Sequence, residues 1–399
     1  MARVLVTDGE LRSALAAVRS LGRAGHRVEV CSPTGASLAG ASRHARADHR
    51  LPAPGSDPEG FARAVIDRAR ALEAEVVLPA SEASMLAILP RRGTLGDAVI
   101  PFGELDAFRR LSDKERAGEL AREVELETPE QRVLEVPADV DDPGLGWPVV
   151  IKPSRSLRAE GDRLREQGVG YAASPDELAA RLAELPTAAY PVLLQRRIEG
   201  PGTGVFLLRW EGETRAVFAH RRIREKPPSG GVSVCRESVA AEPELVARSE
   251  RLLERAGWQG VAMVEFKVDA RSGVPYLMEV NARLWGSLQL AVDAGVDFPR
   301  LLVEAALGRP SAGPPEYRNG VRCRWWWGEV DHLLARLRGR GAGAGGSGMA
   351  DRLRALGPFL PPWRPGDRYE VLRRDDRRPF LRETRRWLRD ALSGGGGPA

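Results

Sequence analysis

The sequence predicts a protein of mixed α/β and α+β class in three parts. An N-terminal unit with a doubly wound parallel sheet is followed by a middle region of antiparallel hairpins and a helical C-terminal extension. Apolar strands alternate with helical segments over residues 1–105, which is typical of parallel sheets. Residues 261–286 form two apolar strand patterns joined by a tight turn, which predicts a hairpin. Beyond residue 313, three consecutive tryptophans precede amphipathic helical segments.

The composition of the 399-residue chain is that of a soluble globular protein. It is 43% hydrophobic and 29% charged, and no run approaches the ~18 apolar residues of a membrane-spanning helix. The first residues lack the apolar core of a signal peptide, so we expect a cytoplasmic location. Cys31, Cys235 and Cys323 lie far apart and show no zinc or disulfide spacing. The net charge of +5 suits an anionic small molecule, and no basic stripe with interleaved aromatics predicts a nucleic-acid partner.

In the N-terminal unit, strands are expected at VLVTDG, HRVEVCSP and EVVLPASE, with helices over residues 13–25 and 57–72. Ligands of parallel sheets bind at the carboxyl ends of strands. Glu82 follows the third of these strands, and we expect it to contact a substrate. No G-x-G-x-x-G follows the first strand, which argues against a dinucleotide site.

Two lysines are placed to meet an anion in residues 106–190. A helix is expected over residues 112–124, with Ser112 as N-cap and Glu115 completing a capping box. Lys114 then falls in the first turn, where the helix dipole disfavours a cation; it either has an anionic partner or is simply solvated. Lys152 ends the buried strand WPVVIK, a position suited to phosphate. The polar segment 154–170 is expected to be a mobile loop.

Residues 191–208 predict a strand, a Gly-Pro-Gly-Thr-Gly turn and a second strand. The following segment 220–238 is rich in cations and is expected to be a loop. It either binds phosphate through guanidinium, ammonium and backbone amide groups or is solvated. The candidate residues in it are Arg221, Arg224 and Lys226.

The hairpin carries the most informative charges. If it is symmetric about Ser272, Glu265 lies opposite Glu279, and strand alternation puts Glu279, Asn281 and Arg283 on one face. Facing carboxylates repel, unless a hard cation such as Mg²⁺ lies between them and takes their oxygens as ligands. A slip of one residue in the strand pairing would move Glu265 to the other face. The alternative to a metal site is an exposed hairpin with scattered charges.

The C-terminal extension, residues 313–399, contains Trp325–Trp327, a Gly-rich linker at 341–348 and a basic amphipathic helix at 377–393. We expect the tryptophans to pack on the main body. We expect the tail GGGGPA to be disordered. The last helix could alternatively touch an anionic membrane surface.

Taken in chain order, these motifs resemble the ATP-grasp superfamily. The resemblance covers residues 110–305 and is closest to proteins similar to the large subunit of carbamoyl phosphate synthetase, among carboxylate–amine ligases. It rests on Lys114, on IKP at Lys152, on LLQRRIEG, on VEF and on MEVNAR. It implies a two-lobed fold, with a small lobe at 106–190 and a large lobe with the Mg·ATP site at 191–312.

The resemblance implies roles residue by residue. It places Mg²⁺, with Mn²⁺ as an alternative, on Glu265, Glu279 and Asn281. It places the ATP phosphates on Lys114 and Lys152 and the adenine on a hinge at Gln195, Arg196 and Ile198. Arg283 and Lys152 would act in phosphoryl transfer. From their positions in the cationic segment and at a strand end, rather than from the resemblance, Arg221 is expected to join them, and Glu82, Arg224 and Lys226 to contact the substrate. In D-alanine–D-alanine ligase a ribose-binding glutamate follows the hinge; here Gly202 stands there, and Glu199 would substitute.

The expected activity is a ligase that uses ATP to activate a carboxylate as an acyl phosphate for attack by an amine or another nucleophile. Its partners would be small-molecule acids and amines, and a homodimer is compatible with the family. The alternative is a regulatory or scaffold module that binds ATP without turnover. A Rossmann oxidoreductase is disfavoured because the glycine fingerprint is missing.

Overall fold

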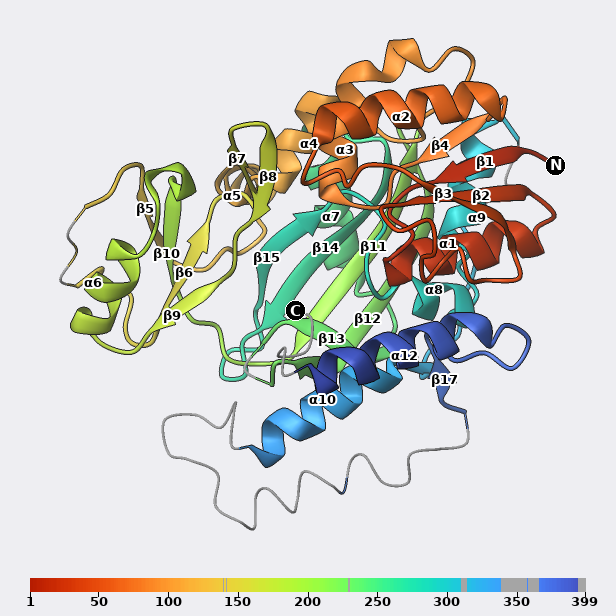
Figure 1. Cartoon of the computed structure of the whole chain (residues 1–399). Helices are drawn as coiled ribbons and strands as arrows, with labels where there is room; N and C mark the ends of the chain where they lie inside the picture. Colours follow the sequence, from red (N-terminus) through yellow and green to blue (C-terminus); the bar gives the residue numbers. More distant parts are fainter. Residues whose placement is uncertain are drawn as a thin grey trace.

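The computed structural model describes residues 1–138, 140, 142–228, 230–309, 314–338, 357 and 366–393. The linker predicted at 341–348 and the tail predicted at 394–399 lie outside the described residues. Four sheets are formed, of four, four, seven and two strands. We refer below to the N-terminal unit, the small lobe, the large sheet and the C-terminal helices (Figure 1).

The N-terminal unit has a four-stranded sheet of order β3-β2-β1-β4 with all pairs parallel. Its helices α1 and α2 lie on opposite sides of the sheet (Figure 1). The predicted parallel sheet is therefore confirmed; the polar strand β3 was not expected. The elements are β1 (Arg3–Val6), α1 (Arg12–Arg23), β2 (Arg27–Ser32), β3 (Ala45–Arg50), α2 (Pro58–Ala71), β4 (Val76–Leu78), α3 (Glu82–Ile88), the 3-10 helix η1 (Leu89–Thr94) and α4 (Leu105–Ser112).

The small lobe is an antiparallel sheet of order β5-β10-β6-β9, with helix α6 packed against β9. The segment 154–170, predicted to be a mobile loop, instead forms a separate two-stranded hairpin, so that prediction is wrong. The amide of Leu164 in this hairpin donates to Gly55 O at 2.7 Å, which ties it to the N-terminal unit. The elements are β5 (Gln131–Leu134), β6 (Val149–Pro153), β7 (Leu157–Glu160), β8 (Arg163–Glu166), β9 (Gly170–Ala172), α6 (Pro175–Ala183), the 3-10 helix η2 (Thr187–Ala189) and β10 (Val192–Arg196).

The large sheet has the order β15-β14-β11-β12-β13-β16-β17. The segment 220–238, predicted as a loop, instead forms most of β12 and β13, paired antiparallel. The cations on the inner face are accommodated by ion pairs: Arg222 pairs with Glu225 and Glu265, Arg224 with Glu329, and Lys226 with Asp331. The elements are β11 (Gly202–Trp210), β12 (Glu213–Lys226), β13 (Val232–Ser238), α7 (Pro243–Arg255), β14 (Gly260–Val268), β15 (Pro275–Asn281), α8 (Leu288–Ala294), α9 (Phe298–Ala306), β16 (Arg322–Arg324) and β17 (Arg368–Tyr369).

Helix α5 (Lys114–Glu123) begins one residue later than the sequence suggested. Asp113 is its N-cap, and the carboxylate accepts hydrogen bonds from the amides of Glu115 and Arg116. Ser112 ends α4 and donates its hydroxyl to Arg109 O at 3.4 Å. The capping box around Ser112 is therefore wrong, because an aspartate one residue further on caps the same helix. Lys114 remains in the first turn, as expected.

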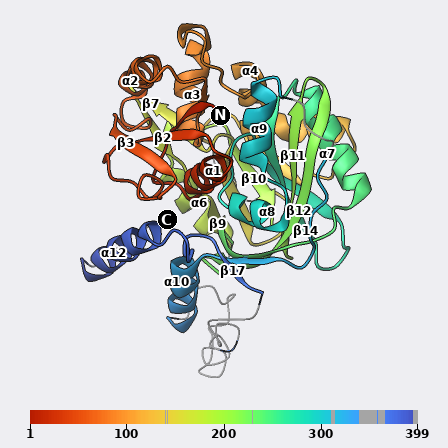
Figure 2. The same cartoon turned by 90° about the vertical axis from the view of Figure 1, so that its right-hand side faces the viewer.

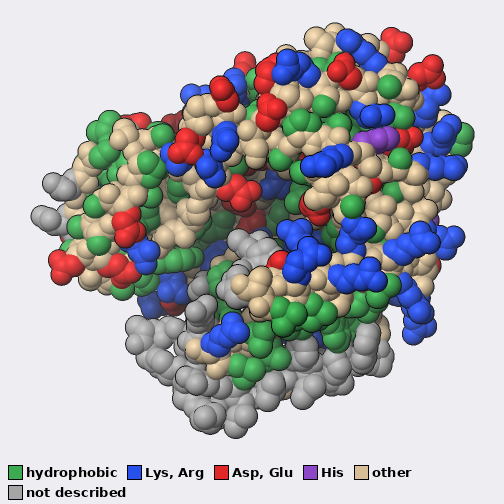
Figure 3. All heavy atoms as spheres, viewed as in Figure 1, with side chains coloured by type: hydrophobic (Ala, Val, Ile, Leu, Met, Phe, Trp, Pro, Cys, Tyr) green, Lys and Arg blue, Asp and Glu red, His purple; other side chains and the backbone are tan. Residues whose placement is uncertain are grey.

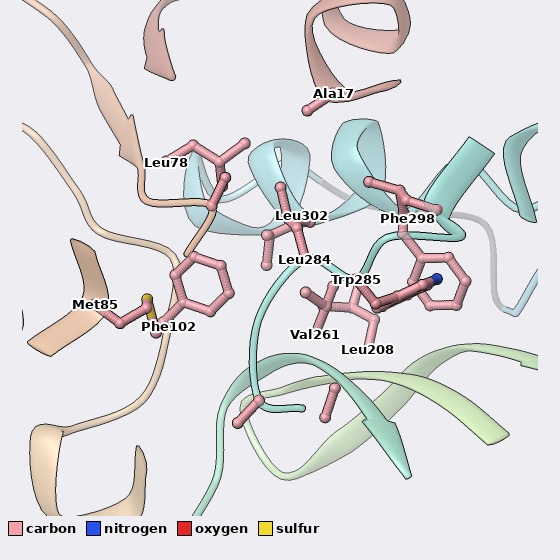
Figure 4. Packing of buried hydrophobic residues seen from close by; sticks show 14 of the residues in the cluster. Ala17, Leu78, Met85, Phe102, Leu208, Val261, Leu284, Trp285, Phe298 and Leu302 are labelled. Carbon is pink, nitrogen blue, oxygen red and sulfur yellow. The ribbon is translucent and has the colours of Figure 1, made fainter. Parts of the chain in front are cut away.

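Two hydrophobic cores are present among the described residues. One runs without interruption through the N-terminal unit and the large sheet. Figure 4 shows its centre, where Ala17 of α1 faces Leu302 and Phe298 of α9, and Trp285 and Leu208 lie beneath them. The small lobe has a separate core that includes Leu134, Ile151, Leu178 and Leu194. The small lobe is thus attached to the rest of the protein through chain connections and polar contacts more than through a shared core.

The C-terminal helices are α10 (Trp326–Leu337) and α12 (Arg378–Leu392). α10 packs against β12 and β13 of the large sheet, and α12 lies below the N-terminal unit (Figure 2). Trp327 stacks on Trp387 with ring centroids 4.1 Å apart, which joins the two helices. Trp325 donates its indole N–H to Glu383 at 2.8 Å, and the Arg12 guanidinium lies over its ring. Within the described part of the chain, no helix combines the length and apolarity needed to span a membrane.

Candidate active site

The two hairpin carboxylates face each other as predicted. Glu265 of β14 pairs with Glu279 of β15, and the pairing continues in the same register to Met263 and Asn281. Between Glu265 and Phe266 the register shifts, so Phe266 pairs with Leu277. The pairing that matters for the site depends on this bulge, because in the register that leaves the turn Glu265 would face Met278 instead of Glu279.

A chain of hydrogen bonds runs along one face of β15 and beyond its end. Arg283 donates to the Asn281 side-chain oxygen at 2.8 Å, and the Asn281 amide donates to Glu279 Oε1 at 2.8 Å. Burial alone would raise the pKa of Glu279, but Lys114, the Asn281 amide and Lys152 lower it below its ordinary value. Glu279 is therefore a carboxylate held in the charged form by neighbours from both the small lobe and the hairpin.

Glu265 has a different electrostatic setting. Burial raises its pKa to about 7, although Arg222 forms an ion pair with it and opposes this shift. Arg222 also pairs with Glu225 at 2.9 Å. The sequence pattern alone does not point to Arg222. Strand alternation places it at the site: His220 lies beside Gly204, which pairs with Glu265, and Arg222 is two residues further along the same face.

Arg221 does not lie with these carboxylates. Its guanidinium pairs with Glu237 of β13 at 2.6 Å, on the opposite face of β12 from Arg222. The sequence predicts Arg221 as a catalytic residue only if its segment is a loop, because in a loop strand alternation does not determine which side chains share a face. The structure brings Arg222 to the site in its place.

Two lysines from outside the hairpin approach the carboxylates of Glu265 and Glu279. Lys152 lies near the end of β6, and burial lowers its pKa to about 8 against the opposing effect of Glu279 and Glu265. Lys114 donates to the Ser156 hydroxyl at 3.0 Å, and its backbone amide bonds Ser154 O at 2.8 Å. The structure thus gathers Lys114, Lys152, Glu265 and Glu279 within electrostatic range of one another. The surface is hollowed between the small lobe and the large sheet, with charged side chains lining the hollow (Figure 3).

Glu82 also belongs to this cluster. It begins α3, directly after the N-cap Ser81 at the carboxyl end of β4. Burial raises its pKa, while Arg283 and Lys114 oppose the rise and Glu279 adds to it. The N-terminal unit therefore contributes an acidic side chain to the same site as the small lobe and the hairpin.

The predicted adenine hinge lies at the end of β10. The Gln195 side chain is buried and donates to the Gln131 side chain at 2.6 Å. The amide of Arg196 is already bonded to Glu130 O at 2.9 Å. The Ile198 amide has no backbone acceptor among the described residues. Glu199 is exposed, with its carboxylate 3.9 Å from Arg197.

Arg224 and Lys226, predicted to contact substrate, are engaged by α10. Arg224 donates to Glu329 at 2.8 Å through its Nε atom, and Lys226 pairs with Asp331 at 2.8 Å. These contacts hold the β12–β13 hairpin against the C-terminal helices. Both cations therefore serve this attachment in the structure, a partner that the sequence did not reveal because α10 lies some hundred residues further along the chain.

The hairpin residues fit Mg²⁺ by the chemistry of their donor atoms. Glu265 and Glu279 offer carboxylate oxygens from facing strand positions. The Asn281 side-chain oxygen accepts from Arg283 and its amide nitrogen faces Glu279, so Asn281 would become a ligand by turning its side-chain amide. Within the described ranges, no group of three or more His, Cys, Asp or Glu side chains is arranged to hold a metal ion. Two carboxylates and an amide suit Mg²⁺ that takes its remaining ligands from phosphates and water.

Comparisons with known proteins support the resemblance found in the sequence. Residues 188–328 match the family model described as ATP-grasp in the biosynthetic pathway with Ter operon. No curated protein matches the sequence.

Solved structures with the same fold include the L-amino acid ligase from Bacillus licheniformis, at 18% identity and a TM-score of 0.62, covering 78% of this chain and 75% of that one. The ADP complex of N5-carboxyaminoimidazole ribonucleotide synthetase has 16% identity and a TM-score of 0.64, covering 85% and 86%. The biotin carboxylase domain of the Hydrogenobacter thermophilus 2-oxoglutarate carboxylase, bound to MgADP, ADP and bicarbonate, has 17% identity and a TM-score of 0.61, covering 80% and 73%. At these identities the likeness shows the fold.

Proposed function

We propose that this protein, which has the ATP-grasp fold, is an ATP-dependent ligase that joins a carboxylic acid to an amine or a related nucleophile. The observation that carries the proposal is the convergence of three parts of the chain on one cluster. The hairpin brings Glu265, Glu279 and Asn281, the small lobe brings Lys152, helix α5 brings Lys114, and the N-terminal unit brings Glu82. Two of the similar structures are of proteins named as a ligase and a synthetase.

In the proposed reaction a carboxylate oxygen of the substrate attacks the γ-phosphorus of ATP, and the bond to the bridging oxygen of ADP breaks. The amine then attacks the carbonyl carbon of the acyl phosphate, phosphate leaves, and the nitrogen loses a proton. When bound to Glu265, Glu279 and Asn281, Mg²⁺ would supply positive charge against the ATP phosphates.

The protein's own residues would act by charge and position. Lys152 of the small lobe and Lys114 of α5 would neutralise the phosphates. Lys152 has a pKa lowered to about 8 by burial, so an incoming polyanion would stabilise its charged form. Arg283 is held by Asn281 and presents a planar fork suited to the substrate carboxylate or the transferring phosphoryl group. No side-chain nucleophile is required.

Nucleotide pockets in this fold hold adenine against a strand edge, and the Ile198 amide is the group best placed for this. Arg196 lies over the Tyr276 ring, 5.3 Å from its centroid, next to the hinge. We infer that the hinge recognises the base through the Ile198 amide. The amide of Arg196 is occupied by Glu130.

The first test is thermal unfolding with ATP or ADP, with and without Mg²⁺. A ligand present at about 100 times its dissociation constant adds about 2.7 kcal/mol. Glu279→Gln and Asn281→Ala should lose the Mg²⁺-dependent rise in Tm, whereas Glu254→Gln, an exposed glutamate on α7, should keep it. An unchanged rise in the Glu279→Gln variant would refute the metal assignment.

The second test separates a ligase from a module that only binds ATP. ATP labelled with ¹⁸O in its β,γ-bridge is incubated with the protein and a panel of carboxylic acids without an amine. Reversible acyl phosphate formation moves the label to a non-bridging position of the β-phosphate. Label movement that requires one acid and is lost in Lys152→Gln supports the ligase. Nucleotide binding with no acid-dependent movement and no phosphate release in any acid–amine pair would favour the binding module.

A further inference from the structure

A basic groove lies on the other side of the molecule's N-terminal unit from the sheet that carries the hairpin. It has a volume of about 1320 Å³ and runs between α12 and the segment 33–46. Eight arginines line it, against four acidic residues, which gives a net charge of +4 (8 − 4). Figure 3 shows basic side chains gathered where α12 meets the N-terminal unit. We refer to this feature as the basic groove.

The acidic side chains of the basic groove already have basic partners. Asp376 pairs with buried Arg19 at 2.8 Å, and Asp375 pairs with Arg23 at 2.8 Å. The carboxylates of Glu10 and Asp390 both lie near Arg386, at 3.5 and 3.9 Å. None of the four therefore remains to balance the other arginines of the groove.

Five guanidinium groups are left without a partner. They carry no hydrogen bond, ion pair or ring contact to any other residue that the structure describes, and all five are exposed. They are Arg46, Arg377, Arg378, Arg385 and Arg389. Like charges one helical turn apart destabilise a helix, and Arg378, Arg382 and Arg386 stand at such spacings, as do Arg385 and Arg389. A multiply charged anion would relieve this repulsion.

The packing of α12 favours a compact anion in the groove over a membrane surface. An interfacial helix lays an apolar face into the lipid. Leu381, Leu388 and Leu392 of α12 are exposed, but its aromatic side chains are used within the protein: Trp387 stacks on Trp327 and donates its indole N–H to Asp331 at 2.9 Å, and Phe380 lies 6.4 Å from Trp327. The arginines face a concave groove, whereas a bilayer surface is flat.

The lining also decides against single-stranded nucleic acid. Proteins that bind single strands stack bases on aromatic side chains, and among the residues that the structure describes none that lines the groove is aromatic. What the groove offers is guanidinium forks, which pair with phosphate through two parallel hydrogen bonds. Along α12, residues three or four apart are spaced by about 4.5–6 Å, so successive arginines can engage successive phosphoryl groups.

We propose that the basic groove is a binding site for a compact, multiply phosphorylated anion, separate from the ATP site. The cavity is large for a small-molecule site, which commonly measures about 300–1,000 Å³, and it can hold several phosphoryl groups with their hydration. The ligand chemistry is that of clustered phosphate esters. The proposal does not depend on the ligase activity.

The test is isothermal titration of the full-length protein with inositol hexakisphosphate, in low salt with EDTA. We expect saturable 1:1 binding that weakens at least tenfold in the triple variant Arg378→Gln, Arg385→Gln, Arg389→Gln. The matched control carries three exposed arginines without partners elsewhere, Arg27→Gln, Arg63→Gln and Arg251→Gln, and should bind as the wild type does. Lys152→Gln should bind inositol hexakisphosphate normally while losing Mg·ADP, which separates the two sites.

The triple variant should fold, because the replaced side chains have no partners to lose, and its Tm without ligand should equal or exceed that of the wild type. As a second variant, Arg46→Glu places a negative charge in the groove from the opposite wall. Absence of saturable binding, or equal binding by the triple variant and the control, would overturn the proposal. So would tight binding of a poly-dT strand or of phosphatidylserine vesicles by a protein that does not bind inositol hexakisphosphate.

Discussion

The small lobe and the rest of the protein differ in how they are stabilised. The N-terminal unit and the large sheet share one continuous hydrophobic core, and buried ion pairs fasten the C-terminal helices to them. The small lobe has its own, smaller core and reaches the body through features such as the Leu164–Gly55 hydrogen bond. We refer to the first assembly as the body.

This difference explains where the candidate site lies. A site between two separately stabilised parts can change its width at little cost, because no shared core has to be opened. Lys152 comes from the small lobe, whereas Glu82, Glu265 and Glu279 come from the body. Lys114 also comes from the body, because its helix α5 packs on α4, α7 and β15 and shares the body's core. Ligand binding should therefore order the two parts relative to each other more than it changes either of them.

The largest effect is expected where the C-terminal helices join the body. Asp376→Ala removes the partner of Arg19, whose side chain is 1% exposed, and leaves an uncompensated charge in the interior. The expected loss of stability is about 3–5 kcal/mol, measured by denaturant unfolding. The neighbouring Asp375→Ala breaks a half-exposed pair with Arg23 and should cost about 1 kcal/mol or less. Equal losses in the two variants would mean that the buried pair does not fasten the extension.

The shared core gives the next prediction. Trp285 packs against Phe206 and Phe298, at 4.5 and 5.1 Å between ring centroids, and Trp285→Ala should cost about 3–5 kcal/mol. Hydrogen exchange should become faster in α1 and β1 as well as in β11, because one core serves them all. Exchange that rises only in the large sheet would show that the N-terminal unit is stabilised independently.

The matched change in the small lobe is Leu178→Ala, which should cost about 2–5 kcal/mol. Leu178 is fully buried in the small-lobe core. Faster exchange should be confined to β6, β9, β10 and α6. If the body also lost protection, the two cores would be energetically coupled and the comparison would fail.

Mg·ADP provides a reversible probe of the same boundary. At about 100 times its dissociation constant it should add about 2.7 kcal/mol. Protection from hydrogen exchange should increase most in β6, in the β7–β8 hairpin and at residues 196–199, and least in β1 and β2. Uniform protection over the whole chain would indicate that the small lobe does not move independently.

The smallest effect is a pH dependence within the C-terminal attachment. Burial raises the pKa of Glu383 to about 7, against the Trp325 hydrogen bond and Arg12. The folded state then binds a proton between pH 4.5 and 7 that the unfolded state has released, so this residue lowers stability as the pH rises through that range. At pH 8, Glu383→Gln should raise the free energy of unfolding by on the order of 1 kcal/mol, and the Tm should rise with it. At pH 4 the Tm should be unchanged. A variant with the same Tm difference at both values would contradict the assignment.

The hairpin shows how much of the site could be predicted. Apolar alternation and a Ser-Gly turn predict the hairpin, because both are local properties of the chain. The bulge after Glu265 completes its alignment with Glu279 and leaves no signal in that pattern. The cationic segment 220–238 predicts a loop, and only its strand pairing shows that Arg222, rather than Arg221, faces the carboxylates. Arg224 and Lys226 were placed at the site for the same reason, although Glu329 and Asp331 hold them.

The sequence alone determined the parallel sheet of the N-terminal unit, the hairpin that carries the two carboxylates, and the ATP-grasp resemblance, since each depends on periodicity or spacing within a short segment. Only the tertiary structure decided which distant charges meet. It paired Asp376 with Arg19, engaged Arg224 with α10 and lined a groove with arginines from both ends of the chain. Ion pairs between residues hundreds of positions apart leave no periodic signal, because their partners are set by how separate cores and sheets pack in space.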